Sequence, residues 1–339
     1  MNTALPLVSI VIPAYNCAGT VATTIESCLA QTWPNLEVVV VNDGSTDGTR
    51  GELARFEPRI RVVDQKNAGL AAARNAGVAV ARGEFIALMD ADDLMLPERI
   101  AVQAAVLAAD PRCVLVSTDF TAFSGVHGEV ECSHIASYYQ AWNRQGGAPS
   151  IYPESLALGG DSPVVRCGEV LENLVWGNFV HPPTTMIRAS ALAAAGPFDV
   201  GLRYSCDYDA FCRIAALGRF AYIDAPLLRY RISPTQMSST VRLGHLPLET
   251  IRVLERIAAA HPALYGRKRE LFDLRIAESL IDAAGQIGSF DRHRSLALLW
   301  QGVRIRRVPR MAARSLVHIV LPRGVVVALK SVRNALVGT

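Results

Sequence analysis

Residues Phe85–Leu94 read FIALMDADDL and bring an apolar run directly against three acids. The first five residues are apolar or small, which is typical of a buried strand. Asp90, Asp92 and Asp93 follow within four positions, where like charges repel one another. The pattern predicts a strand whose carboxyl end lies beside a bound positive charge.

The same alternation of apolar runs and helical spacing extends on both sides of this stretch. Strand and helix in turn predict an α/β fold, with a mostly parallel sheet covered by helices on both faces. The expected strands cover residues 7–14, 36–45, 60–65 and 84–92, and the expected helices cover residues 19–32, 48–57, 69–82 and 97–110.

Three polar segments fall at the carboxyl ends of these strands. They are PAYN at 13–16, NDGSTDG at 42–48 and DADD at 90–93. Parallel sheets bind their ligands beyond the carboxyl ends of the strands. We therefore expect the three segments to converge on one site.

Beyond residue 111 the pattern is less regular. Gly, Ser, His and Pro accumulate over 124–163, which predicts a long loop or insertion. From about residue 243 the spacing is helical only, so we predict an α/β domain over 1–240 and a helical region over 241–339. Elements expected in between are strands over 113–120 and 221–233, a turn and short strand over 181–188, and helices over 166–178, 190–198 (capped by Ser190) and 205–218.

Composition excludes several classes of protein. The chain has 339 residues, is 50% hydrophobic and carries a net charge of +3, which does not indicate a nucleic-acid partner. Its seven cysteines include no C-x-x-C pair, so we expect free thiols in a reducing compartment. We see neither a signal peptide nor a run of about 18 apolar residues, and expect a cytoplasmic protein.

The C-terminal segment is basic and amphipathic. After Asp291 there are ten basic residues and no acid, interspersed with apolar side chains such as Trp300. Such a composition favours peripheral contact with the anionic inner face of the cytoplasmic membrane. A solvated helical cap or a dimer interface would give the same pattern.

The acids of residues 90–93 suit a hard cation. Asp90 and Asp92 can offer carboxylate oxygens to Mg²⁺ or Mn²⁺, which usually also binds water and substrate phosphate oxygens. The metal would then reconcile these acids with a diphosphate. The alternative is that Asp92 and Asp93 only cap the helix that follows.

The segment NDGSTDGT at 42–49 has three interpretations. A calcium loop of the EF-hand type is rejected, because Ala54 stands where the bidentate Glu belongs. A strand-to-helix turn suits Gly44 and Gly48. Asp43 could also accept a hydrogen bond from a nucleotide base, which is compatible with the turn.

Five segments in order, VSIVIPAYN, VVVVNDGSTDGT, NAGLAAARNAG, GEFIALMDADD and CDYDAFCRIAALG, resemble the successive motifs of inverting glycosyltransferase family two. The resemblance covers about residues 8–239. It implies the GT-A fold, a Rossmann-like sheet carrying the catalytic site. It also implies a nucleotide-diphospho-sugar donor and a Mn²⁺ or Mg²⁺ ion.

The resemblance implies roles for the residues on the donor side. Pro13, Tyr15 and Asn16 match the segment that packs beside the base. Asp43 matches the acid that reads the base, normally uracil or thymine, which favours a UDP- or dTDP-sugar. Arg74 matches an arginine near the nucleotide.

Further roles concern the metal and the reaction. Asp90 matches the acid near the ribose and metal, and Asp92 the acid that holds the metal on the diphosphate. Asp207 matches the general base, although Cys206 precedes it where the family usually has Glu. The motif that marks processive members is missing, because QMSSTV stands in its place at 236–241.

Two residues are open to either of two interpretations. Arg231 can face phosphate or be an ordinary surface arginine. His181, followed by two prolines, can contact the diphosphate or acceptor or be a structural loop residue.

One base opposite a metal-bound leaving group predicts a single displacement with inversion. The acceptor would be a hydroxyl of a glycan or of a lipid-linked glycan. The alternatives are a sugar-nucleotide nucleotidyltransferase and a non-catalytic module that binds glycan or nucleotide on the same fold.

Overall fold

The computed structural model divides into two compact units, residues 1–233 and 234–339. The predicted boundary between residues 240 and 241 lies outside the described residues. The structure describes residues 5–124, 128–131, 134–159, 162–233, 245–288 and 290–320.

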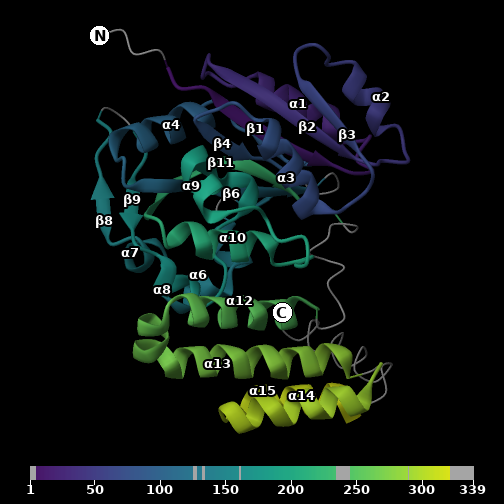
Figure 1. Cartoon of the computed structure of the whole chain (residues 1–339), viewed down its shortest axis with the longest axis vertical. Coiled ribbons are helices and arrows are strands. Elements are labelled where there is room, and N and C mark those ends of the chain that lie inside the picture. The colour runs from purple at the N-terminus through teal and green to yellow at the C-terminus, as the bar shows by residue number, and fades with distance from the viewer. Residues whose placement is uncertain are drawn as a thin grey trace. The chain divides into compact units, whose positions relative to one another are not determined.

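The first unit is built on a sheet in which eleven strands are described, in the order β3-β2-β1-β4-β10-β6-β11-β9-β8, with β5 beside β11 and β7 beside β6 (Figure 1). Its first half is parallel, as the sequence predicts. The parallel strands there are β1 (Val8–Ala14), β2 (Leu36–Asp43), β3 (Arg61–Gln65) and β4 (Phe85–Leu88).

The α/β class is confirmed, but the second half of the sheet is mixed. Only β6 and β11 are parallel to each other there, because short strands enter as antiparallel partners on either side of them. These strands are β5 (Leu94–Met95), β6 (Cys113–Ser124), β7 (Gly128–Glu131), β8 (Glu154–Leu156), β9 (Val165–Gly168), β10 (Met186–Arg188) and β11 (Arg219–Arg231).

Helices cover both faces of the parallel half. The crossovers through α1 and α2 run one way across the sheet and the crossover through α3 runs the other way. Because such crossovers are right-handed, α1 and α2 lie on the opposite face from α3. The helices are α1 (Val21–Leu29), α2 (Thr49–Ala54), α3 (Leu70–Val80) and α4 (Arg99–Ala109).

The structure differs from the sequence prediction in the insertion and in the helices that follow it. Residues 166–168 pair with β11 as part of β9, so the helix expected over 166–178 shrinks to α8 (Leu171–Leu174). Ser190 lies inside α9 (Ala189–Ala195) rather than capping it. The other elements of this region are α5 (Ile135–Tyr138), α6 (Gln140–Arg144), α7 (Ala148–Ile151), η1 (Pro182–Thr184) and α10 (Cys206–Ala215).

The described part of the second unit is helical, as expected. The helix α13 packs against the other three, and its buried face includes Phe272 and Ile281. Gly302 allows close approach, because a Cβ there would lie 2.8 Å from a side-chain carbon of Ile281. The helices are α12 (His245–Ala260), α13 (Pro262–Ile287), α14 (Arg292–Ile305) and α15 (Pro309–Val320).

Candidate active site

The three predicted segments lie together at the carboxyl ends of β1, β2 and β4. The backbone N–H of Asn16 donates to Ser45 Oγ at 3.1 Å, and Asn16 Oδ1 accepts from the N–H of Thr46 at 2.8 Å. Thr20, in the turn after β1, donates from Oγ1 to the carbonyl of Ala91 at 3.0 Å. The acid loop, residues 90–93, is thereby joined to the turn that follows β1.

Asp90 forms an ion pair with a buried arginine of α3. The Nη2 atom of Arg74 lies 3.1 Å from Asp90 Oδ1, and the Arg74 side chain is 3% exposed while that of Asp90 is 33% exposed. The Nε–H of Arg74 is buried without a hydrogen-bond partner among the described residues. Burial opposes the charge of Arg74, but Asp90, Cys206 and Asp207 together raise its pKa.

Asp207 faces this same ion pair from the first turn of α10. It is half-buried, and its Oδ1 accepts from the backbone N–H of Tyr208 at 2.8 Å. Burial raises the pKa of Asp207 and Asp90 adds to that rise, while Arg74 and the Tyr208 N–H oppose it. The structure therefore brings Arg74, Asp90 and Asp207 into one electrostatic group.

Asp92 completes the group on the side of β11. Burial, and then the charge of Asp90, raise the pKa of Asp92 to about 6, and Arg231 opposes this. Arg231 donates from Nε to the carbonyl of Asp92 at 2.8 Å and lies over the ring of Phe123 at 4.5 Å. Its two terminal amino groups form no hydrogen bond with the described residues.

The carboxylates fit a hard cation that takes the rest of its ligands from substrate and water. The described residues contain no cluster of three or more His, Cys, Asp or Glu arranged to hold a metal by themselves. They do hold Asp90 close enough to Asp92 that the charge of Asp90 disfavours the charged form of Asp92. Two neighbouring carboxylates provide negative charge but few ligand oxygens. This suits Mg²⁺ or Mn²⁺, which can take further ligands from phosphate.

Asp43 ends β2 and is 3% exposed. Its Oδ1 accepts from Gln65 Nε2 at 2.7 Å and from the N–H of Ala68 at 2.8 Å, and its Oδ2 accepts from the N–H of Gly69 at 2.9 Å. A carboxylate offers about four acceptor positions, so one remains for a base N–H. The carboxylate also fixes the loop that leads into α3 and Arg74.

The segment at the end of β1 contains Pro13 within the strand and Tyr15 and Asn16 directly after it. Pro13 is half-buried in the strand, whereas Tyr15 is 52% exposed and leaves a ring free to stack. Asn16 has a φ of 49°, a left-handed conformation that Asn adopts more readily than most residues. The turn at Asn16 joins the segment to residues 45 and 46.

His181 is buried within a group of aromatic rings. It stacks on Phe120 with ring centroids 4.2 Å apart, and its Nδ1 lies 3.0 Å from the hydroxyl of Tyr139. Burial, then the charges of His134, Arg74 and Arg99, lower the pKa of His181 to about 3. A neutral imidazole cannot offer a diphosphate a positive charge, so the geometry favours the structural interpretation.

Two features of the site were missed in the sequence. The charges of Asp207 and Asp90 contribute to raising the pKa of Tyr139, after burial and Tyr138, which puts this tyrosine near the acids. It comes from the segment interpreted as a loop, which has no motif. The sequence indicates only a helix cap at Asp93, whereas its buried carboxyl accepts from the backbone N–H of Arg231 at 2.8 Å.

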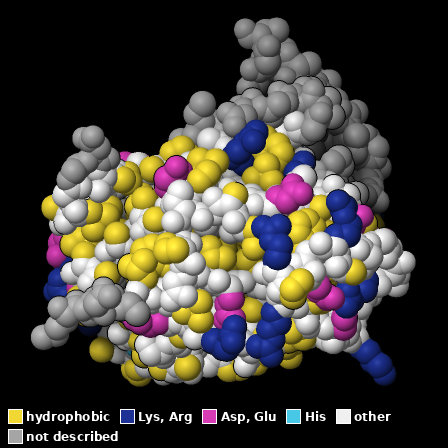
Figure 2. Space-filling model, turned by 90° about the horizontal axis from the view of Figure 1, so that it is seen from above, with side chains coloured by type: hydrophobic (Ala, Val, Ile, Leu, Met, Phe, Trp, Pro, Cys, Tyr) yellow, Lys and Arg dark blue, Asp and Glu magenta, His cyan; other side chains and the backbone are white. Residues whose placement is uncertain are grey.

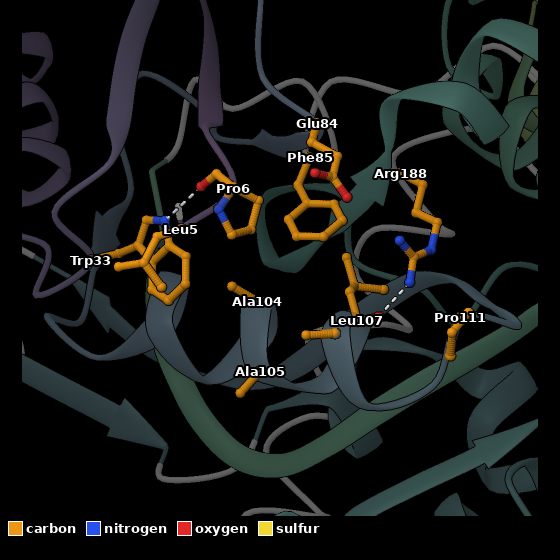
Figure 3. Close-up of a pocket in the computed structure, with 11 residues that line it drawn as sticks. Leu5, Pro6, Trp33, Glu84, Phe85, Ala104, Ala105, Leu107, Pro111 and Arg188 are labelled. Atoms are coloured by element: carbon orange, nitrogen blue, oxygen red, sulfur yellow. Dashed lines mark hydrogen bonds between the residues drawn. The ribbon is translucent and has the colours of Figure 1, made fainter. Parts of the chain in front are cut away.

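A groove at the opposite edge of the sheet from the candidate site lacks the acid pair of that site (Figure 3). It encloses about 410 Å³ between the start of β4 and α4. The Nε1–H of Trp33 donates to the carbonyl of Pro6 at 3.1 Å, and Arg188 donates to the carbonyl of Leu107. Its walls are mainly apolar, so it offers no acid pair for a metal.

Comparison with known proteins supports the sequence motifs. Residues 9–147 match the family model described as glycosyl transferase family 2. An uncharacterized glycosyltransferase of Rickettsia typhi is 28% identical over 70% of this chain and 68% of its own length, and one of Haemophilus influenzae is 28% identical over 74% and 72%. A chondroitin synthase of Escherichia coli is 43% identical over 28% of this chain and 14% of its own length.

Solved structures show the same fold at low identity. Staphylococcus aureus TarS 1-349 in complex with UDP-GlcNAc has a TM-score of 0.58 and 17% identity, covering 92% of this chain and 91% of that chain. Mannosyltransferase PcManGT from Pyrobaculum calidifontis, in complex with GDP-Man and Mn²⁺, has a TM-score of 0.51 and 22% identity, covering 94% and 87%. The expected GT-A fold is confirmed by these likenesses.

Proposed function

Because residues 9–147 belong to glycosyl transferase family 2 and the chain is a glycosyltransferase, we propose that it moves one sugar from a nucleotide-diphospho-sugar to a hydroxyl of a glycan or lipid-linked glycan. The transfer is a single displacement with inversion. The observation that carries the proposal is the electrostatic group of Asp90, Arg74 and Asp207 at the carboxyl edge of the sheet, next to Asp92 and Arg231.

Asp207 is the general base. A hydroxyl is a weak nucleophile, so a carboxylate must take its proton as the new bond forms. Burial raises the pKa of Asp207 and makes it a better proton acceptor, while the charge of Arg74 opposes that rise by favouring the carboxylate form. The donor lies on the other side of the acceptor oxygen, over the acid loop.

Asp90 and Asp92 would hold a divalent ion, Mn²⁺ or Mg²⁺, together with the diphosphate. Such an ion would supply positive charge to the leaving diphosphate. Arg231 adds a second positive group there, because its terminal amino groups have no partner among the described residues while its Nε is fixed on the Asp92 carbonyl. The Mn²⁺ in the mannosyltransferase complex supports a metal of this kind.

Asp43 and Tyr15 select the nucleotide. The free acceptor position of Asp43 suits the N3–H of uracil or thymine, and the exposed ring of Tyr15 can stack on the base. Pro13 and Asn16 shape the turn that carries Tyr15. A UDP- or dTDP-sugar is therefore the favoured donor, and the UDP-GlcNAc complex of TarS agrees with a uridine nucleotide.

The second unit holds the enzyme at the inner face of the cytoplasmic membrane, near a lipid-linked acceptor. Among the described residues no helix is long and apolar enough to span a bilayer. Residues 292–320 contain no acid, and several of their apolar side chains are exposed. By contrast, Lys and Arg lie among Asp and Glu on the face of the molecule that Figure 2 shows. The basic residues of this segment are Arg292, Arg294, Arg304, Arg306, Arg307, Arg310 and Arg314.

A thermal-shift screen of UDP-, dTDP- and GDP-sugars tests the proposal. A ligand that binds only the folded chain at 100 times its Kd stabilises it by about 2.7 kcal/mol. We expect a uridine or thymidine nucleotide sugar to raise Tm with Mn²⁺ and to lose most of that effect with a chelator. Equal shifts with and without chelator would contradict the metal bridge, and no shift with any sugar nucleotide would contradict the function.

A further inference from the structure

We propose that Asp93 is a positioning residue that fixes the acid loop to strand β11, so that Asp92 and Arg231 meet the same diphosphate. The inference rests on the proposed function and names a residue that this function does not use. Asp93 itself is completely buried, so its carboxyl touches neither metal nor substrate.

The first support is the way in which the side chain of Asp93 continues a backbone ladder. Strand β5 pairs antiparallel with β11 through Leu94 and Met95, and the N–H of Leu96 donates to the carbonyl of Leu227. Further along β11, the N–H of Arg231 donates instead to Asp93 Oδ1 at 2.8 Å. A carboxyl oxygen thus takes the place of a strand carbonyl where the acid loop turns away from the sheet.

The second support is a return contact from β11 to the acid loop. The Nε–H of Arg231 donates to the carbonyl of Asp92 at 2.8 Å, and its guanidinium lies over Phe123. On the far side, Thr24 Oγ1 of α1 donates to the carbonyl of Asp93 at 2.8 Å. The loop is therefore held from β11 and from α1, and two of its contacts go to the same arginine.

The role of Asp93 is to accept a hydrogen bond. Only one of its oxygens is used, because Oδ2 is buried without a hydrogen-bond partner among the described residues. Asparagine offers the same acceptor oxygen at nearly the same size, whereas alanine removes the acceptor of the Arg231 N–H. Asp93→Asn should therefore preserve the clamp and Asp93→Ala should break it.

The test measures hydrogen exchange of the peptide that contains Arg231, together with the affinity for Mn²⁺ and UDP, in the full-length chain. Ser9→Ala is the matched control, because Ser9 is equally buried and accepts from the N–H of Gly83 at 2.8 Å at the other end of β1. For Asp93→Ala we expect faster exchange at Arg231 and a Kd for UDP with Mn²⁺ raised at least tenfold. Asp93→Asn should stay within about threefold of the parent chain, as should Ser9→Ala for UDP.

Three outcomes would overturn the inference. Asp93→Ala could leave the exchange at Arg231 and the affinity for UDP unchanged, which would leave Asp93 no positioning role. Asp93→Asn could be as damaging as Asp93→Ala, and then the charge rather than the acceptor would matter. A parent chain that binds no nucleoside diphosphate would contradict the proposed function, and this inference with it, whatever the exchange at Arg231.

Discussion

The carboxyl of Asp92 lies where its negative charge lowers the stability of the fold. Its carboxyl is held beside Asp90 in a half-buried place, and the pKa is raised to about 6. An acid whose pKa is higher in the folded than in the unfolded chain destabilises the fold at any pH above both values. A carboxylate that lowers the stability of the fold is more consistent with a functional role than with a structural one.

Asp92→Asn should therefore stabilise the ligand-free chain while removing its metal dependence. We expect an increase in the free energy of unfolding of about 1 to 2 kcal/mol at pH 7.5, a value discounted for partial exposure. Urea unfolding of both chains measures it. Loss of stability in Asp92→Asn would show that the carboxylate is a structural group.

The affinity for Mn²⁺ should depend on pH in the acidic range. Protonation of Asp92 competes with metal binding, so affinity is greatest above about pH 6 and falls as the pH drops through that value. Electron paramagnetic resonance of free Mn²⁺, titrated with the chain and UDP between pH 5 and pH 8, gives the profile. An affinity that stays flat over this range would contradict a role for Asp92.

Motifs identified most of the candidate site because they lie in short, continuous segments. The motif residues Asp90, Asp92 and Asp207 converge because strand ends and a helix start bring them together. The sequence did not predict that Arg74 would pair with Asp90, which depends on how α3 packs, or that Asp93 would clamp Arg231, 138 residues away. Contacts between distant segments leave no periodic signal in the chain.

At the scale of elements, α3 is the support of the site. It carries Arg74, and one turn later Gly77 lets the helix approach the sheet. A Cβ at Gly77 would lie 2.4 Å from Val11 Cγ1 and 3.2 Å from Val41 Cγ2. The Ala-rich sequence of the helix serves the same close packing.

Gly77→Ala should therefore push α3 away from β1 and carry Arg74 with it. Overpacking of this kind costs about 1 to 3 kcal/mol, and we also expect weaker binding of UDP with Mn²⁺. Gly51→Ala in α2 is the control, because nothing lies within 4 Å of its new Cβ and helix propensity alone should stabilise it by about 0.5 to 1 kcal/mol. Thermal unfolding compares the two, and equal effects would contradict the packing argument.

The elements of the parallel half were predictable, and those of the insertion were not. Buried parallel strands are continuous apolar runs, and the helices between them have a regular apolar spacing. Strands β8 and β9 are three and four residues long and pair only at the edge of the sheet. Strand β9 pairs with β11, which lies more than 50 residues further along the chain, and β8 in turn takes its register from β9.

At the scale of the whole molecule, the two units differ in composition. The first holds every candidate site residue, and the second contains the acid-free segment over 292–320. Three of the ten basic residues, Arg323, Lys330 and Arg333, lie outside the described residues. Trp300, on α14 in the same acid-free segment, is 64% exposed.

Charge reversal in the second unit should weaken binding to anionic vesicles. Each basic residue near such a surface contributes about 1 kcal/mol, so Arg304→Glu with Arg307→Glu should lower the affinity for phosphatidylglycerol vesicles at least about 30-fold. Arg55→Glu with Arg59→Glu changes the net charge equally in the first unit and serves as control. A blue shift of tryptophan fluorescence, to which the exposed Trp300 is sensitive, reports binding, and equal losses in both variants would contradict a localised membrane surface.

The most direct measurement compares turnover by Asp207→Asn and Asp209→Asn. Both lie in the first turn of α10, but Asp209 pairs with Arg213 at 2.9 Å, so we expect it to take no part in the chemistry. Release of nucleoside diphosphate from the donor chosen by the thermal-shift screen is followed with a membrane lipid extract as acceptor. We predict that Asp207→Asn lowers kcat by about 10² to 10⁴-fold with unchanged affinity for UDP and Mn²⁺, while Asp209→Asn keeps kcat within about threefold. Full turnover by Asp207→Asn would contradict its role as the base.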